Sequence, residues 1–193
     1  MTRIVLASQS PRCIALLRQI GLVPEVIPSK IEETMDIALS PSENAMRLAE
    51  AKAIEVGGRL GEGIIIGADT IVLLNGEYLG KPVDRSDAIR MLELLSGRTH
   101  IVITGFSIVA MPGGRRVSDF EETQVTFRPI PRSEIEAYVA SGSPMDKAGS
   151  YGIQDDYGAV FVSRVEGCYY NVVGLPLSKL YVKLQEFQTH MNG

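Results

Sequence analysis

The stretch from Gly63 to Leu74 constrains the fold more than any other part of the chain. It reads GIIIGADTIVLL and is almost continuously apolar. Such a run is typical of a strand buried on both faces of a sheet. Asp69 interrupts it, and a carboxylate among isoleucines needs a cation, a metal ion or hydrogen-bond donors to stay charged. We therefore expect a buried strand that carries a metal ligand or a general base, although an Asp that caps a turn would give the same pattern.

Helix and strand signals alternate over the rest of the chain. Apolar runs between turn residues predict further strands at 3–7, 24–28, 101–110, 116–127 and 159–165. The turn sequences at 75–76 (Asn-Gly) and 112–114 (Pro-Gly-Gly) predict hairpins. Because hairpins interrupt the alternation, we expect a mixed α/β sheet flanked by helices rather than a purely parallel sheet.

Capping residues mark the predicted helices. Starts are expected at Ser10 with Pro11, at Ser40 with Glu43, at Ser86, at Ser133 with Glu136, and at Leu177. Glycines are expected to end the first three of these helices, at Gly21, after Val56 and at Gly97, and the last helix is expected to end at Phe187. The polar, glycine-rich residues 144–158 predict a long loop.

Length, charge and cysteines limit the class of protein. A chain of 193 residues suits one large α/β domain or two small lobes. A net charge of −4 disfavours a nucleic-acid partner, which usually meets a basic face. No apolar stretch is long enough for a membrane span, and the N-terminal one is too short for a signal peptide. Cys13 and Cys168 have neither zinc nor redox spacing, so we expect a reducing, cytoplasmic setting.

The turn from Ser8 to Arg12 is the first candidate binding site. A strand ends there, a hydroxyl-rich turn containing Ser8 and Ser10 follows, and a helix begins with Arg12 in its first turn. Free N–H groups at a helix start attract anions, and a guanidinium matches phosphate or a base carbonyl. A plain helix cap with an exposed arginine would look the same.

Further charged residues lie near these segments in the sequence. Lys81 lies in the turn 80–82 (Gly-Lys-Pro) after the first hairpin, and Lys52 lies on the second predicted helix. Either lysine could reach a phosphate or could be a solvated surface residue. The carboxylate pair Glu32-Glu33 could share a divalent ion with Asp69, or could belong to a solvated loop.

The loop sequence MDKAGSYGIQ, residues 145–154, is the last candidate. Long glycine-rich loops are often functional, and the amide of Gln154 could contact the edge of a base. Other site classes are excluded, because the chain has no P-loop sequence and no GxGxxG. His100 and His190 have no metalloprotease or triad context; we expect His100 at a strand start and His190 in the C-terminal tail.

Four segments together, in this order, resemble the Maf family of nucleoside triphosphate pyrophosphatases: 7–12, 67–70, 80–82 and 145–154. The resemblance covers nearly the whole chain. It implies one domain over residues 1–193, with an elongated mixed sheet, two lobes around a cleft, and a homodimer. It also implies hydrolysis of a nucleoside triphosphate to the monophosphate and pyrophosphate with Mg²⁺ or Mn²⁺.

The resemblance also assigns residues. Asp69 matches the proton acceptor, and we expect the metal ion at Asp69 and Glu33. The combination at the base-selecting positions is that of the branch acting on dTTP and UTP: Arg12, Thr70 and Gln154. The remaining polar positions of the cleft are matched by Ser8, Glu33, Lys52 and Lys81, and we expect Ser10 to bind substrate as well. In the implied mechanism, water activated by Asp69 or by the metal attacks the α-phosphorus and pyrophosphate leaves.

Cys13 departs from the family pattern, which has a second arginine there. We expect the lost charge to weaken the grip on the triphosphate. A thiol at a helix start could also be acidified, and a thiolate would repel phosphates. This departure leaves a second function open, a nucleotide-binding regulator of cell division (septum formation) with little turnover.

Overall fold

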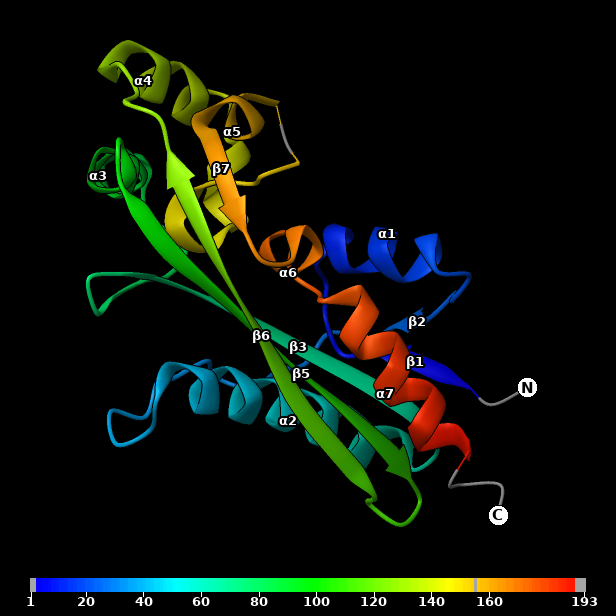
Figure 1. Ribbon diagram of the computed structural model, residues 1–193. Helices are drawn as coiled ribbons and strands as arrows, with labels where there is room; N and C mark the ends of the chain where they lie inside the picture. Colours follow the sequence, from blue (N-terminus) through cyan, green and yellow to red (C-terminus); the bar gives the residue numbers. More distant parts are fainter. Residues whose placement is uncertain (1–2, 155, 190–193) are drawn as a thin grey trace. The chain divides into compact units, whose positions relative to one another are not determined.

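The fold is built on a seven-stranded mixed sheet. The computed structural model describes residues 3–154 and 156–189 (Figure 1). Neighbouring strands follow the order β2-β1-β3-β5-β6-β7, and β4 pairs with β3. The strands are β1 (Ile4–Leu6), β2 (Glu25–Val26), β3 (Gly63–Leu74), β4 (Glu77–Leu79), β5 (Thr99–Met111), β6 (Arg116–Phe127) and β7 (Val162–Glu166).

Strand directions confirm the mixed sheet expected from the sequence. β1 runs parallel to both β2 and β3, whereas β3 with β4 and β6 with β7 are antiparallel. The hairpin turns predicted at 75–76 and 112–114 join β3 to β4 and β5 to β6. The strand predicted over 24–28 is shorter than expected, with only two residues in β2.

The chain forms two compact units. The first consists of Met1–Asp69, Thr104–Glu121 and Gly174–Gly193, and the second consists of Thr70–Ile103 and Glu122–Val173. The chain therefore passes into the second unit directly after Asp69, within strand β3.

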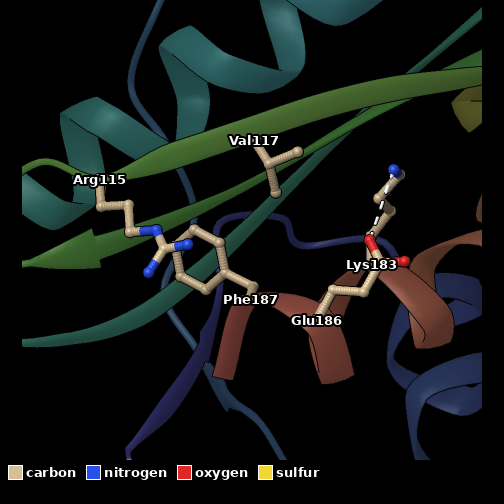
Figure 2. Close-up of a pocket in the computed structure, with 5 residues that line it drawn as sticks. All are labelled: Arg115, Val117, Lys183, Glu186 and Phe187. Atoms are coloured by element: carbon tan, nitrogen blue, oxygen red, sulfur yellow. Dashed lines mark ion pairs between the residues drawn. The ribbon is translucent and has the colours of Figure 1, made fainter. Parts of the chain in front are cut away.

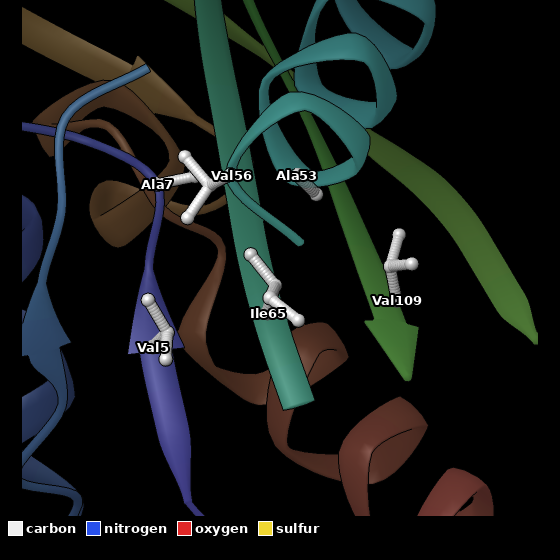
Figure 3. Packing of buried hydrophobic residues seen from close by; sticks show 6 residues of the cluster. All are labelled: Val5, Ala7, Ala53, Val56, Ile65 and Val109. Carbon is white, nitrogen blue, oxygen red and sulfur yellow. The ribbon is translucent and has the colours of Figure 1, made fainter. Parts of the chain in front are cut away.

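The core of the first unit joins the sheet to helix α2 (Pro41–Leu60). Ala53 and Val56 of α2 pack with Ile65 of β3, Val109 of β5, and Val5 and Ala7 at the β1 strand (Figure 3). Every one of these six side chains is at most 1 % exposed. Continuous burial explains the apolar character of the Gly63–Leu74 stretch.

Two glycines let α2 lie directly against the strands. A Cβ atom at Gly67 of β3 would lie 2.0 Å from the carbonyl oxygen of Ala49, and one at Gly105 of β5 would lie 2.4 Å from the carbonyl carbon of Ala45. Both distances are too short for any side chain, so only glycine permits this close packing of helix on sheet.

The helices differ from the sequence predictions mainly at their ends. Their bounds are α1 (Pro11–Gln19), α2 (Pro41–Leu60), α3 (Arg85–Leu95), α4 (Arg132–Ala140), α5 (Asp156–Phe161), α6 (Tyr169–Val173) and α7 (Leu177–Thr189). The capping box of Ser40 and Glu43 is confirmed. The predicted stop after Val56 is wrong, because α2 continues through Gly57, where a Cβ would lie 3.0 Å from Cε of Met111. Gly61 ends the helix in a left-handed conformation.

Two of the predicted helix starts are also wrong, those at Ser86 and Ser133. Helix α3 begins at Arg85 because Asp84 caps it, accepting a 2.8 Å hydrogen bond from the N–H of Asp87. Helix α4 has no side-chain cap, since Ser133 already lies inside its first turn. Helix α1 begins at Pro11 with Ser10 at the N-cap, as predicted, although the Ser10 side chain makes no capping hydrogen bond.

The segment from 143 to 173 is more helical than predicted. The expected loop contains two short 3₁₀ turns, Ser143–Asp146 and Ala148–Ser150. The strand expected over 159–165 is wrong at its start, because residues up to Phe161 form α5 and β7 begins at Val162. The β-branched residues in 159–165 suggested a strand, but so short an apolar run does not by itself distinguish a strand from a short helix.

No helix within residues 3–154 and 156–189 is long and apolar enough to cross a membrane.

Candidate active site

Asp69, Lys52 and Glu33 form an ion triad in the first unit. The Nζ atom of Lys52 lies 2.5 Å from Oδ1 of Asp69 and 2.7 Å from Oε1 of Glu33. The side chains of Lys52 and Asp69 are 11 % and 9 % exposed, whereas that of Glu33 is 43 % exposed. The cation that Asp69 needs is therefore Lys52, and the triad opens to solvent on the side of Glu33.

The lysine of this triad stays charged. Burial disfavours the ammonium, but the carboxylates of Asp69 and Glu33 outweigh burial and raise the pKa of Lys52 above its ordinary value. The ammonium also lies 3.4 Å from the carbonyl oxygen of Ala68. A permanent positive charge is thus fixed between two acidic side chains from distant parts of the sequence.

Close packing of α2 on the sheet sets this geometry. Lys52 lies one turn after Ala49, the residue whose carbonyl occupies the space left open by Gly67. Because Gly67 is two residues before Asp69 on β3, the same close approach brings the lysine to the carboxylate. A bulkier residue at position 67 would separate them.

The turn from Ser8 to Arg12 begins where β1 ends. The N–H of Ala7 donates to the carbonyl of Ile66 at 2.8 Å, which places the turn beside the part of β3 that leads to Asp69. The Ser8 hydroxyl accepts a 3.1 Å hydrogen bond from the N–H of Ser10, and Pro11 opens α1. The predicted helix-start geometry is present, and Ser8 accepts a hydrogen bond within the turn.

Cys13 is a buried, neutral thiol. Its side chain is 5 % exposed, and its Sγ donates to the carbonyl of Gly174 at 3.5 Å. Burial raises the pKa of the thiol and outweighs the opposing effects of Ser10, Arg12 and Lys52. The expected acidified thiolate is therefore wrong, because desolvation dominates at this helix start. Because the thiol is neutral, Cys13 does not repel phosphates.

In the second unit, two of the sequence segments are joined by a hydrogen bond. The N–H of Gly149 donates to the carbonyl of Gly80 at 3.0 Å, which ties the loop 145–154 to the turn carrying Lys81. Gly149 has a φ of 67°, and a Cβ there would lie 3.1 Å from Cγ1 of Val72. The structure thus brings the segments of Lys81 and Gln154 together, with Lys81 exposed and Gln154 half-buried.

His100 is a residue whose role the sequence did not reveal. It lies at the start of β5, as predicted, but its Nε2 atom is 2.7 Å from the hydroxyl of Tyr151 and its ring packs edge-on against Phe127. Burial lowers the pKa of His100 to about 4, so the ring is neutral at pH 7. The contact anchors the loop 145–154 through Tyr151. An isolated histidine in a strand gives no sequence signal for such a partner.

The acidic residues of the triad suit a metal only together with other donors. Within residues 3–154 and 156–189, no three His, Cys, Asp or Glu side chains are grouped as a metal-binding set. Asp69 and Glu33 offer two carboxylates around one ammonium. Mg²⁺ typically takes one or two carboxylates and completes its shell with water and substrate phosphates. This donor set therefore fits an ion that binds with its nucleotide.

A separate small pocket in the first unit contains none of the predicted site residues. It has a volume of about 140 Å³ and is lined by Arg115, Val117, Lys183, Glu186 and Phe187 (Figure 2). The Arg115 guanidinium lies over the Phe187 ring, 5.1 Å from its centre. Lys183 and Glu186 pair at 3.5 Å.

A charged triad beside an arginine-bearing helix start, on a mixed α/β sheet, is the arrangement of an enzyme that handles phosphate groups. The chain belongs to the Maf family, since the model for Maf-like proteins matches residues 3–187. It is 46 % identical over 185 residues to a dTTP/UTP pyrophosphatase of Carboxydothermus hydrogenoformans, covering 96 % of this chain and 98 % of the relative. A dTTP/UTP pyrophosphatase of Bacillus anthracis is 48 % identical over 187 residues, covering 97 % and 96 %. The family resemblance of the four segments is thereby confirmed.

Proposed function

We propose that this chain hydrolyses dTTP and UTP to the nucleoside monophosphate and pyrophosphate. The observation that carries the proposal is the triad of Asp69, Lys52 and Glu33, which gives a buried carboxylate a permanent cation. Relatives at 46–48 % identity over nearly their full length bear the name dTTP/UTP pyrophosphatase. With the thiol of Cys13 neutral, no structural observation favours a regulator without turnover.

In the proposed mechanism Asp69 accepts a proton from the attacking water. The Lys52 ammonium favours the carboxylate form, which is the form that can accept a proton. The turn from Ser8 to Arg12, including Ser10, binds phosphate oxygens through its N–H groups and the Arg12 guanidinium. Water attacks the α-phosphorus, the bond to the bridging oxygen of the β-phosphate breaks, and pyrophosphate leaves.

The second unit supplies further proposed substrate-binding residues. Lys81 is a cation for phosphate, and Thr70 and Gln154 are proposed to select the base, as their match to the family implies. The hydrogen bond between Gly149 and Gly80 supports a joint role for Lys81 and Gln154, because it fixes their two segments to each other.

We propose Mg²⁺ or Mn²⁺ as the cofactor, held by Asp69 and Glu33 together with nucleotide phosphates. When bound, the ion would neutralise phosphate charge and lower the pKa of a bound water. Lys52 would hold the two carboxylates close to each other.

We also propose a homodimer in the cytoplasm, with all 193 residues acting as one functional domain. The thiols of Cys13 and Cys168 are both unpaired, as is usual in a reducing compartment. The dimer rests on the family resemblance alone, and light scattering on the purified chain tests it.

A pyrophosphate-release assay tests the proposed activity. Purified protein is given dTTP, UTP, CTP, GTP and methylated GTP, with Mg²⁺, with Mn²⁺ and with a chelator. We expect release from dTTP and UTP well above that from the purine nucleotides, and loss of release with the chelator. Tight nucleotide binding without turnover of any of the five would reject the proposal in favour of a binding protein.

A further inference from the structure

The segment that carries Glu33 has little structure of its own. Residues 27–36 form neither helix nor strand, and residues 32–38 are all exposed. Because these residues are exposed, packing in the core does not hold them in place. The place of Glu33 beside Lys52 must therefore be fixed by side chains that bind the segment from outside.

Helix α2 provides these side chains along one face. Near its end, Arg59 donates to the carbonyl of Pro28 at 2.8 Å, and Glu55 accepts from the N–H of Lys30 at 3.2 Å. One turn earlier Lys52 binds Glu33 itself. Residues three and four positions apart lie on the same side of a helix, so the segment follows the axis of α2 in the opposite direction.

Asn44 and Arg47, nearer the start of α2, bind the segment immediately beyond Glu33. The guanidinium of Arg47 donates through Nη2 to the carbonyl of Thr34, the residue that follows Glu33. The same Nη2 lies 3.3 Å from Oδ1 of Asn44, which accepts a 2.8 Å hydrogen bond from the N–H of Asp36. The amide nitrogen of Asn44 donates to the carbonyl of Asp36 at 2.8 Å. Asn44 is fully buried, so this anchor is rigid.

We propose that Arg47 is a positioning residue for the reaction, acting through Glu33. By holding the Thr34 carbonyl, it fixes the backbone next to Glu33 and so keeps that carboxylate on the Lys52 ammonium. Lys52 in turn stays aligned with Asp69. This inference rests on the proposed pyrophosphatase function for its kinetic consequence, but the placement of the segment can be measured without turnover.

The test is a double-mutant cycle between Arg47→Ala and Glu33→Gln, read out as kcat/KM for dTTP. Loss of an outer partner that orients a site residue typically costs about tenfold to a hundredfold. We expect Arg47→Ala to lower kcat/KM at least tenfold in the natural chain. In a chain that already carries Glu33→Gln, the same substitution should lower kcat/KM less than about twofold. If Arg47→Ala only reduced the folded fraction, the two losses in kcat/KM would multiply in the double variant. That result would overturn the proposal. Arg47→Lys keeps a positively charged N–H donor and should therefore recover part of the rate.

Arg59→Ala is the matched control. Arg59 lies on the same helix and binds the same segment, but at Pro28, five residues before Glu33. We expect its kcat/KM to stay within about twofold of the natural chain. A loss equal to that of Arg47→Ala would show that any weakening of the segment has this effect, and would overturn the specific role of Arg47.

Hydrogen exchange of the ligand-free chain separates this proposal from the proposed function. Peptides covering 30–39 should exchange faster in Arg47→Ala, while peptides within β3 stay unchanged. Unchanged exchange in 30–39 would overturn the proposal, even if the enzyme is active. If the natural chain releases no pyrophosphate, the proposed function fails, and the exchange result alone decides whether Arg47 positions the segment.

Discussion

The ammonium of Lys52 lies 2.5 Å from Oδ1 of Asp69, although the two residues come from a helix and a strand. Glu33 completes the group from an exposed segment. The contact explains how a carboxylate persists in the most apolar strand of the chain. It also makes Asp69 and the packing of α2 the first targets for experiment.

Asp69→Asn should abolish pyrophosphate release while the fold remains. The amide cannot accept a proton as the carboxylate does, and a lost general base costs at least about a hundredfold. Turnover of dTTP is measured beside circular dichroism and nucleotide binding. Full activity in a folded variant would remove Asp69 from its proposed role.

Gly67→Ala should destabilise the chain by about 3 kcal/mol, because its Cβ would lie 2.0 Å from the carbonyl oxygen of Ala49. Gly58→Ala is the control, since a Cβ at Gly58 of α2 meets nothing within 4 Å. Alanine is the better helix former there and should raise the free energy of unfolding by about 0.5–1 kcal/mol. Urea unfolding measures both. Equal effects of the two substitutions would contradict the close packing of α2 on β3.

His100 should make the protein less stable as the pH falls from about 6.5 to about 4. Burial lowers its pKa from 6.5 to about 4, so the unfolded chain binds a proton more readily than the folded chain over this range. The stability from the neutral ring is complete above pH 6.5, and about 3 kcal/mol of it is lost by pH 4.

Urea unfolding between pH 7 and pH 4 measures this effect against His100→Gln. Glutamine keeps a polar partner for Tyr151 but does not titrate. We expect a shallower pH dependence in the variant. Identical slopes in the two proteins would show that His100 does not govern acid stability.

Cys13 should resist alkylation at neutral pH. Its thiol is 5 % exposed and has a raised pKa, whereas Cys168 is only half-buried. Because the thiolate is the reactive form, N-ethylmaleimide should label Cys168 well before Cys13. Mass spectrometry of tryptic peptides gives the two rates. Faster labelling of Cys13 would restore the thiolate that the sequence suggested.

The local sequence determined most of the elements. The apolar run at Gly63–Leu74 defined β3, the capping box of Ser40 and Glu43 defined the start of α2, and Asn75-Gly76 defined a hairpin. These signals act over a few residues, where backbone preference and apolar spacing decide the outcome. The four segments were sufficient in the same way to indicate the family.

Only the tertiary structure decided which charges meet and which groups stay neutral. Lys52 is 17 residues from Asp69 in the chain, and their contact depends on a helix that can touch the strand at Gly67. Gly57-Gly58 resembles a helix stop, yet α2 continues to Leu60, and Met111 occupies the space that a Cβ at Gly57 would need. Cys13 resembles an acidified thiol, yet burial keeps it protonated. Close packing and desolvation involve residues far apart in sequence, so local patterns cannot report them.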